Sequence, residues 1–253
     1  MAELLLLGTG SSLNDGTREP TMLALRGRES TTLVDCGSNP IRQLQRLGVP
    51  IASVERIILT HSHPDHNSGF GLLFTMVWLS GRRHPIPIYG PADAIDTTQR
   101  LFEQWDTSDW RNLPALEWHE VKLQVGAPIF ADADFELTAA PGVHHVPVIG
   151  VRARNVHGGG VMVYSSDGEP SASIQALAQG ADLLVHEATV PSDGNGHTSA
   201  ASAARLARAA GARRLLLVHL SAGADELEKQ RQAAEQVFGD QVFIGRDLDR
   251  YEF

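Results

Sequence analysis

Residues 61–66, His61-Ser62-His63-Pro64-Asp65-His66, constrain the fold of this chain more than any other segment. Three imidazoles and a carboxylate lie within six residues, directly after the apolar run at 57–59. Neutral imidazoles and carboxylate oxygens are the ligands that zinc-class cations bind. The apolar run predicts a buried strand whose end fans these ligands into a loop, with 67–69 as a turn or helix entry. The fold must then bring further ligands to this strand end, unless the motif is only a solvated histidine-rich loop.

The composition is that of a globular chain with an acidic surface. Of 253 residues, 42% are hydrophobic and 20% charged, and 21 basic against 30 acidic side chains give a formal net charge of −9. A negative surface repels phosphate backbones and argues against a large nucleic-acid interface. The single cysteine, Cys36, excludes an internal disulfide and a thiolate-rich structural zinc site.

The first residues and the spread of apolar side chains indicate a cytoplasmic protein. Met1-Ala2-Glu3 and the four leucines after them lack the basic start and the long apolar stretch of a signal peptide. No segment approaches about 18 uninterrupted apolar residues, so no membrane span is expected. A reducing compartment also fits the use of one cysteine.

Apolar runs and helical patterns alternate along the chain and predict an α/β protein of layered sheets and helices. Strands are expected at 4–7, 22–25, 31–35, 57–59, 86–89, 135–140, 151–155, 161–164, 183–185, 213–218 and 241–245. Helices are expected at 40–47, 70–80, 92–104, 171–179, 199–210 and 224–238. No change of composition suggests a linker, so residues 1–253 are predicted to form a single domain.

Two stretches have an unusual apolar content. Residues 70–80 are apolar nearly all round, which suits a helix that is buried or covered by a partner subunit. Residues 105–118 are irregular and hold three of the four tryptophans. They suit either surface packing or a lid over a substrate.

Several predicted strands are followed by a residue of metal-ligand type. His144, Asp167 and His219 each come just after an apolar run, as His61 does. Each one alone is better explained as a surface histidine or a turn residue. Together they predict that four strand ends converge on one sheet edge.

These motifs together resemble the metallo-β-lactamase fold, and within it ribonuclease Z and the related cyclic phosphodiesterases. The matching segments span nearly the whole chain: Leu7–Gly10, Val34–Gly37, Leu59–His66, Ile88–Pro91, His144 with Gly150, Tyr164–Asp167, His186–Thr189, His197–Ala200 and Val218–Ser221. The resemblance implies a four-layered αββα sandwich of the α/β class, with metals at one edge between the sheets.

The resemblance also implies a centre of two divalent ions, zinc first, with manganese or iron as alternatives. The implied ligands are His61, His63 and His144 for one ion, Asp65, His66 and His219 for the other, and Asp167 as a bridge. His144 is preferred to His145 because its spacing to Gly150 matches the family. Asp35 matches a residue that supports the metal loop through hydrogen bonds without binding metal.

The same resemblance implies a mechanism. A hydroxide that bridges the two ions attacks phosphorus, and the cations offset the negative charge that develops. Asp65 matches a carboxylate that orients or deprotonates this nucleophile. His197 matches the proton donor to the leaving alkoxide, and Glu187 the carboxylate that pairs with it and favours its charged form. Without the resemblance, His197 is equally well a polar residue at a helix start.

Two departures from the family narrow the substrate. Ribonuclease Z proper carries a long tRNA-gripping arm, but its place here holds only the hairpin 151–164, which argues against a large RNA. The cyclic phosphodiesterases bear a cysteine-containing zinc site that Cys36 alone cannot reproduce. We therefore expect a phosphodiesterase for small cyclic or nucleotide diesters, with no membrane partner and with segment 70–80 in a homodimer interface.

Other functions remain open at this point. Hydrolysis of a lactone, thioester or β-lactam needs the same hydroxide and Lewis acid, so the ligand set does not separate it from phosphodiester cleavage. The pair His197 and Glu187 favours phosphodiesters, because their alkoxide leaving groups need a proton. A metal sensor without enzymatic activity is the third alternative, and metal-dependent turnover of any diester excludes it.

Overall fold

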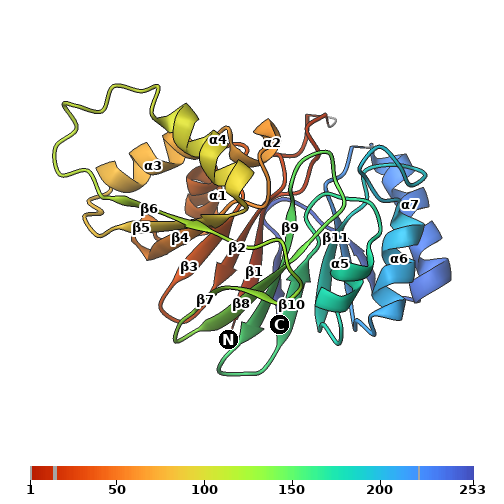
Figure 1. Cartoon of the computed structure of the whole chain (residues 1–253). Helices are drawn as coiled ribbons and strands as arrows, with labels where there is room; N and C mark the ends of the chain where they lie inside the picture. The colour runs from red at the N-terminus through yellow and green to blue at the C-terminus, as the bar shows by residue number, and fades with distance from the viewer. Residues whose placement is uncertain (1, 14–15, 222) are drawn as a thin grey trace.

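Two β-sheets packed face to face form the centre of the molecule (Figure 1). The computed structural model describes residues 2–13, 16–221 and 223–253. Within these residues each sheet has seven strands. The first sheet has the order β14 (Arg250–Glu252), β1 (Glu3–Gly8), β2 (Met22–Arg26), β3 (Thr31–Val34), β4 (Val54–Ile58), β5 (Ile86–Gly90) and β6 (Leu116–Glu120). The second has the order β13 (Val242–Ile244), β12 (Leu215–Val218), β11 (Leu183–Glu187), β10 (Val161–Tyr164), β9 (Ile149–Asn155), β8 (Phe135–Pro141) and β7 (Ala127–Ala131).

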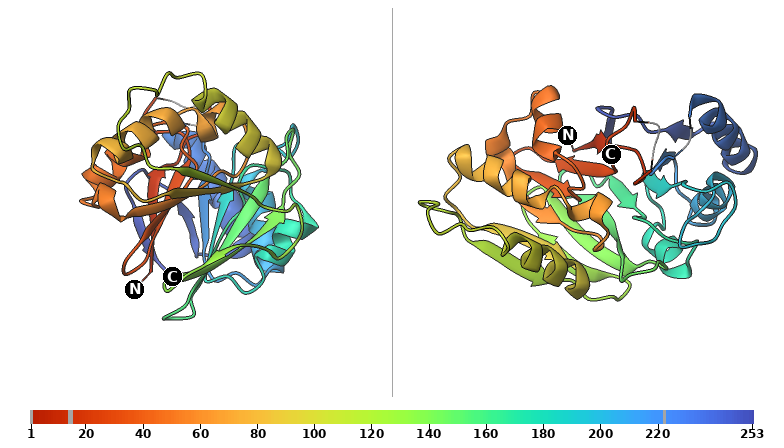
Figure 2. Two further views of the ribbon diagram at one scale, coloured as in Figure 1. Left: turned by 60° about the vertical axis from the view of Figure 1, so that its left-hand side comes forward. Right: turned by 90° about the horizontal axis from the view of Figure 1, so that it is seen from above.

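Helices cover the outer face of each sheet (Figure 2). The first sheet is covered by α1 (Pro40–Arg46), α3 (Phe70–Leu79) and α4 (Ala92–Phe102), and the second by α5 (Ala172–Leu177), α6 (Ala200–Ala209) and α7 (Ala224–Phe238). The short helix α2 (Pro64–Asn67) lies at one edge of the sandwich, and a 3-10 turn (Ile51–Ser53) precedes β4. The predicted αββα architecture is confirmed.

The continuous apolar runs of the sequence arise because the sheets are buried on both faces. In β1, Leu4 and Leu6 pack into the core between the two sheets, whereas Leu5 and Leu7 pack under the helices of the first sheet. Side chains alternate across a strand, so a strand covered on both sides needs an apolar residue at every position. A third apolar cluster joins the second sheet to α5, α6 and α7.

Parallel pairing explains why the ligand-type residues meet at one edge. Strands β3 to β6 run parallel in the first sheet, and β10 to β13 run parallel in the second. The carboxyl ends of parallel strands lie at the same edge of their sheet. Strand β8 is antiparallel to β9, which is antiparallel to β10, so β8 ends at this edge as well.

The structure also contains elements that the patterns did not predict. Strands β6, β7 and β14 lie at sheet edges, where the exposed side needs no apolar residues and the periodic signal is weak. The expected strand at 57–59 begins earlier, at Val54. The metal motif does not stay a loop, because Pro64 starts the helix α2 and places Asp65 and His66 on it.

The two unusual apolar stretches pack against each other. Trp110 stacks on Trp78 of α3 with ring centroids 4.7 Å apart, and the Trp105 ring lies against Gly71. This matches the surface-packing interpretation of residues 105–118. Helix α3 is not buried all round, because Leu72 and Leu79 are 52% and 69% exposed. None of the helices in the described part of the chain has the length and apolarity needed to cross a bilayer.

Candidate metal centre

Strands of both sheets end at one edge of the sandwich, beside α2 (Figure 1). The ligand-type histidines and aspartates gather at that edge. His61 follows β4, Asp167 follows β10 and His219 follows β12. His144 lies in the connection from β8 to β9. The predicted convergence of strand ends is therefore present in the structure.

Seven side chains form two groups in which the potential ligand atoms lie within 4.8 Å of one another. The first group is His61, His63 and His144, and the second is Asp65, His66, Asp167 and His219. The same distance criterion also groups His144 with Asp167 and His197, and Glu187 with His197 and His219. The first two groups contain the residues that the resemblance assigns to the metal ions. The second group is the more deeply buried of the two.

Asp167 lies between the two groups. Its Oδ2 is 3.1 Å from His219 Nε2 and 3.4 Å from His66 Nε2 in the second group. The same oxygen is 3.9 Å from His61 Nε2 in the first group. In the first group, His63 Nδ1 and His144 Nε2 are 3.1 Å apart. A carboxylate in this position can serve two cations at once.

The partners of two histidines determine which ring nitrogen carries the proton. His66 Nδ1 lies 2.8 Å from Asp35 Oδ2, and His144 Nδ1 lies 2.8 Å from the Gly196 carbonyl oxygen. Carboxylate and carbonyl oxygens only accept, so both Nδ1 atoms donate. In the neutral rings Nε2 then presents a lone pair toward the centre, which is the form that binds metal.

His219 has the same tautomer, imposed through Thr189. The Thr189 hydroxyl donates to Glu187 Oε2 at 2.6 Å, because the carboxylate has no proton to give. The single hydroxyl hydrogen is thereby used, so at 2.7 Å from His219 Nδ1 the oxygen accepts. Nε2 of His219 is left to face Asp167.

Asp35 organises the floor of the centre. It is fully buried and accepts from the Thr60 amide at 2.7 Å and the Thr60 hydroxyl at 2.8 Å. The hydroxyl oxygen then accepts from His61 Nδ1, 3.1 Å away. A Cβ at Gly37 would lie 1.6 Å from the Asp65 carbonyl oxygen, so only glycine allows this loop to pass so close to α2. Asp35 thus orients two ligand-type histidines, as expected for a supporting residue.

Backbone strain is concentrated in the same loops. Asp35, Ser166 and His219 have φ of 64°, 55° and 56°, in the left-handed region that favours glycine. Such a conformation costs roughly 1–2 kcal/mol for a residue with a Cβ. Strain of this kind gathers at functional sites, where the surrounding contacts impose it.

The donors fit a divalent cation. Three buried atoms, His61 Nε2, His66 Nε2 and Asp167 Oδ1, have no hydrogen-bond partner. Leaving a buried polar atom unpaired costs roughly 1–3 kcal/mol, and a cation removes that cost. Among the described residues no lysine or arginine forms an ion pair with Asp65 or Asp167. Imidazole nitrogens with carboxylate oxygens suit zinc, and also manganese and iron.

The electrostatics differ between the two ligand groups. Burial alone lowers the pKa of His66, but Asp167 and Asp35 outweigh it and raise that pKa well above its ordinary value. Burial lowers the pKa of His61 well below its ordinary value, and burial also lowers the pKa of His63 and His144. Burial alone raises the pKa of Asp167, but His219 and His66 outweigh it and hold that pKa well below the usual range. The three histidines of the first group therefore need not lose a proton before a metal binds, whereas a charged His66 releases one.

His197 and Glu187 form a hydrogen-bonded pair beside both groups. His197 Nδ1 lies 3.1 Å from Glu187 Oε1, and Glu187 is fully buried. The His197 ring centroid is 5.2 Å from that of His144 and 5.5 Å from that of His219. The hydrogen bond to Glu187 raises the pKa of His197, which suits an acid that works near neutral pH.

Several residues of the centre were not identified from the sequence. Thr60 and Thr189 fix histidine tautomers, and Gly196 and Glu169 hold the loop of His197. The two threonines stand next to or inside the quoted motifs, which was the available signal. His145 belongs to neither ligand group, and its Nε2 lies 2.9 Å from the Asn195 carbonyl oxygen.

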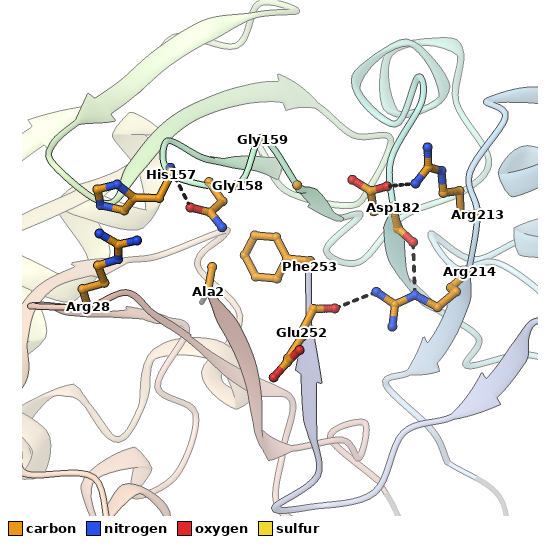
Figure 3. A pocket seen from close by; sticks show the side chains of 12 residues that line it. Ala2, Arg28, His157, Gly158, Gly159, Asp182, Arg213, Arg214, Glu252 and Phe253 are labelled. Carbon is orange, nitrogen blue, oxygen red and sulfur yellow. Dashed lines mark hydrogen bonds and ion pairs between the residues drawn. The ribbon is translucent and has the colours of Figure 1, made fainter.

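A cavity lies away from this centre, lined by residues from both chain ends such as Ala2 and Phe253 (Figure 3). It has a volume of about 730 Å³. Arg213 pairs with Asp182 at 2.9 Å, and Arg214 donates to the carbonyl oxygens of Asp182 and Glu252 at 3.3 Å and 2.6 Å. Both guanidinium groups already contact protein oxygens, so the size of the cavity alone does not indicate chemistry.

Comparison with known proteins agrees with this geometry. The model of a family described as "Beta-lactamase superfamily domain" matches residues 31–220. The chain belongs to the beta-lactamase superfamily. The match extends from β3 to the residue after His219, so it includes both ligand groups of this superfamily member.

The relatives of this superfamily member include ribonucleases and metallo-β-lactamase fold proteins. The ribonuclease Z of Methanothermobacter thermautotrophicus is 29% identical over 291 aligned residues, which cover 94% of this chain and 92% of the relative. The metallo-beta-lactamase fold protein YhfI from Bacillus subtilis superposes with a TM-score of 0.83 at 26% identity, with full coverage of both chains. Human tRNase Z, short form, shares the fold with a TM-score of 0.80 at 24% identity, covering 99% of this chain and 98% of its own. The resemblance expected from the motifs is confirmed.

Proposed function

We propose that this metal-dependent hydrolase cleaves phosphodiesters and that residues 1–253 form one hydrolase domain. The observation that carries the proposal is the His197–Glu187 pair, which stands beside both ligand groups with Nδ1 and Oε1 3.1 Å apart. A leaving alkoxide needs a proton, and a positioned imidazolium is a suitable donor. The ribonuclease Z name of the relatives supports the same substrate chemistry.

The cofactor that the donors fit is a pair of divalent ions, with zinc preferred over manganese and iron. His61, His63 and His144 would hold one ion, Asp65, His66 and His219 would hold the other, and Asp167 would contact both. When bound, such ions supply a hydroxide nucleophile near neutral pH and offset negative charge on the phosphoryl oxygens.

Side chains of the protein orient the attacking water and protonate the leaving group. Asp65, whose side chain is 14% exposed against 3% for Asp167, can reach the attacking water and orient it. His197 holds the proton that the leaving oxygen takes, and Glu187 keeps the ring oriented and stabilises its charged form. Buried Glu187 also accepts from the Gly168 and Thr198 amides, which holds the pair in place.

We propose small cyclic or nucleotide diesters as the substrates. Strands β9 and β10 form a hairpin whose connection is residues 156–160, where ribonuclease Z proper carries its arm. With a net charge of −9, the surface also repels long polyanions. Both observations favour a small substrate whose phosphate the metal centre alone can neutralise.

A substrate panel on metal-replete protein tests the proposal. We would assay cyclic nucleotides, bis-p-nitrophenyl phosphate, a pre-tRNA, an acyl-homoserine lactone and a β-lactam. Turnover of the small diesters that a chelator abolishes and zinc restores is the expected result. Turnover confined to the lactone or the β-lactam would reject phosphodiester cleavage, and no turnover with bound metal would favour a sensor.

We also propose a cytoplasmic homodimer that uses the exposed apolar face of α3. Leu72 and Leu79 leave an apolar strip on the surface, and Cys36 is buried and unpaired, as in a reducing compartment. Light scattering at micromolar concentration should give the dimer mass, and Leu79→Glu should give the monomer mass. Leu123→Glu, at an exposed leucine elsewhere, is the control. A monomeric wild type would contradict the dimer.

A further inference from the structure

A tight turn between β11 and α6 connects a predicted metal ligand to the predicted proton donor. The Gly194 amide donates to the His197 carbonyl oxygen at 3.1 Å, and the His197 amide donates to the Gly194 carbonyl oxygen at 3.1 Å. The two residues between them, Asn195 and Gly196, have φ of 53° and 75°. Asn-Gly is the preferred sequence for a two-residue turn with both φ values positive. His197 therefore sits at the fixed base of this Asn195–Gly196 turn.

The tip of the turn rests on His144 and its neighbour. The Gly196 carbonyl oxygen accepts from His144 Nδ1 at 2.8 Å, and the Asn195 carbonyl oxygen lies 2.9 Å from His145 Nε2. A Cβ at Gly196 would lie only 2.7 Å from His144 Nδ1. The turn thus decides the orientation of one metal ligand while it carries the proton donor.

Glu169 holds the turn in this place. Its Oε1 accepts from the Gly196 amide at 3.0 Å, while the carbonyl oxygen of the same residue accepts from His144 Nδ1. Its own amide donates to the Val143 carbonyl oxygen at 2.8 Å, directly before His144. Glu169 also lies two residues after Asp167. One side chain and its backbone therefore tie together the segments that carry His144, Asp167 and His197.

We propose that Glu169 is a positioning residue that couples metal binding at His144 to the placement of His197. The proposal rests on the proposed function, because it assigns a role within the same centre. Glu169 holds Gly196, Gly196 orients His144, and an oriented His144 binds its ion more tightly. Coupling free energies are reciprocal, so an ion bound at His144 in turn stabilises the turn and the position of His197.

Metal affinity and hydrogen exchange test the coupling without relying on activity. Zinc affinities of metal-stripped protein would be measured by competition with a chromophoric chelator. Amide exchange of residues 194–198 would be followed with and without zinc. In the wild type, zinc should protect these amides. Glu169→Ala should weaken one of the two zinc sites by about 10–100-fold and remove the protection, because outer partners of ligands carry effects of that size.

Two substitutions at the same position sharpen the test. Glu169→Gln keeps a carbonyl oxygen for the Gly196 amide and should stay within about 3-fold of the wild-type zinc affinities. Glu169→Asp keeps the charge but shortens the side chain, so its zinc affinities should resemble those of Glu169→Ala. If Glu169→Ala does not fold, Glu169→Asp takes its place in the experiment. Glu136→Ala is the control: it removes an exposed carboxylate of β8 that pairs with Arg154 of β9, and it should behave as the wild type.

The leaving-group dependence completes the experiment. Glu169→Ala should lose more rate on alkyl diesters than on bis-p-nitrophenyl phosphate, because a displaced His197 no longer protonates the alkoxide. Wild-type zinc affinities and wild-type protection in Glu169→Ala would overturn the inference. If the wild type binds zinc and cleaves diesters, and Glu169→Ala has the same affinities and rates, the coupling is rejected but the proposed function stands. A wild type that cleaves no diester rejects the proposed function instead.

Discussion

Asp35 and Asp134 are both buried aspartates, but they lie at opposite ends of the sandwich and have different partners. Asp35 accepts from the Thr60 amide, the Thr60 hydroxyl and His66 Nδ1, at 2.7–2.8 Å. Asp134 accepts from the amides of residues 28–30 at 3.0–3.3 Å and from the Ser30 hydroxyl. The first carboxylate orients a histidine whose other nitrogen has no partner. The second joins the β2–β3 turn to the start of β8, and its Oδ1 lies 3.6 Å from His157 Nε2.

This difference shows which features indicate chemistry in this molecule. The end that contains Asp134 has a cavity of about 730 Å³, yet Arg213 and Arg214 there already pair with protein groups. At the metal end, buried nitrogen and oxygen atoms that can bind a cation have no hydrogen-bond partner. Unpaired buried donors are costly unless a ligand completes them, so they are a stronger indication of function than cavity size.

The largest effect should follow from removing a histidine at the metal end. His63→Ala should abolish activity and lower the metal content, because the first ligand group loses one of its three members. His157→Ala, a histidine beside the cavity at the other end, should change neither quantity. Elemental analysis and diester turnover measure both. Full zinc occupancy in His63→Ala would refute its assignment as a ligand.

The next effect concerns the proton donor. His197→Ala should slow alkyl diesters by about 10²–10⁴-fold, the usual contribution of general acid catalysis. Bis-p-nitrophenyl phosphate should lose less than about 10-fold, because its leaving group needs little protonation. Steady-state rates on the two substrates give the ratio. Equal losses on both would remove His197 from the acid role.

A smaller effect should follow from changing the carboxylate at the metal end. Asp35→Asn should lower zinc affinity by about 10–100-fold, because the amide no longer favours the proton on Nδ1 of His66. Chelator competition measures the change, with Asp134→Asn as the matched control at the opposite end. If Asp35→Asn has the zinc affinity of the wild type, Asp35 does not support the metal centre, and the proposed difference between the two aspartates is wrong.

The smallest effect should be on stability alone. Asp134→Asn should lower the free energy of unfolding by about 1–3 kcal/mol, because it weakens hydrogen bonds to a buried charged acceptor. Urea titration at neutral pH measures the loss. Activity of the folded variant should equal that of the wild type, and a loss of turnover without a loss of stability would contradict the structural role.

The stability contribution of Asp134 also depends on pH. Burial alone raises the pKa of this carboxyl group, but the amide hydrogen bonds from residues 28–30 outweigh it and lower the pKa. The unfolded chain therefore binds the proton first as the pH falls. The contribution is complete above about pH 5 and is lost as the pH falls below about 3.9 toward the folded-state pKa. The difference between wild type and Asp134→Asn should shrink over that range.

Much of the fold was predictable because its signals are local. Both faces of β1, β10 and β12 are buried, so their apolar runs identify them as strands. Edge strands such as β6 and β14 lack that constraint and were missed. The helix α2 was missed for a different reason, since its four residues are too few to show helical periodicity.

The sequence by itself determined the residue types of the centre, because His61–His66 and the polar residues after apolar strands are visible in the local pattern. Only the tertiary structure decided which ring nitrogen faces inward and which loop holds the proton donor. Those decisions depend on contacts between distant residues, such as His66 with Asp35, His219 with Thr189 and Gly196 with Glu169. A hydrogen bond across 27–31 residues leaves no periodic signal in a sequence, since it exists only once the strands have brought their ends together.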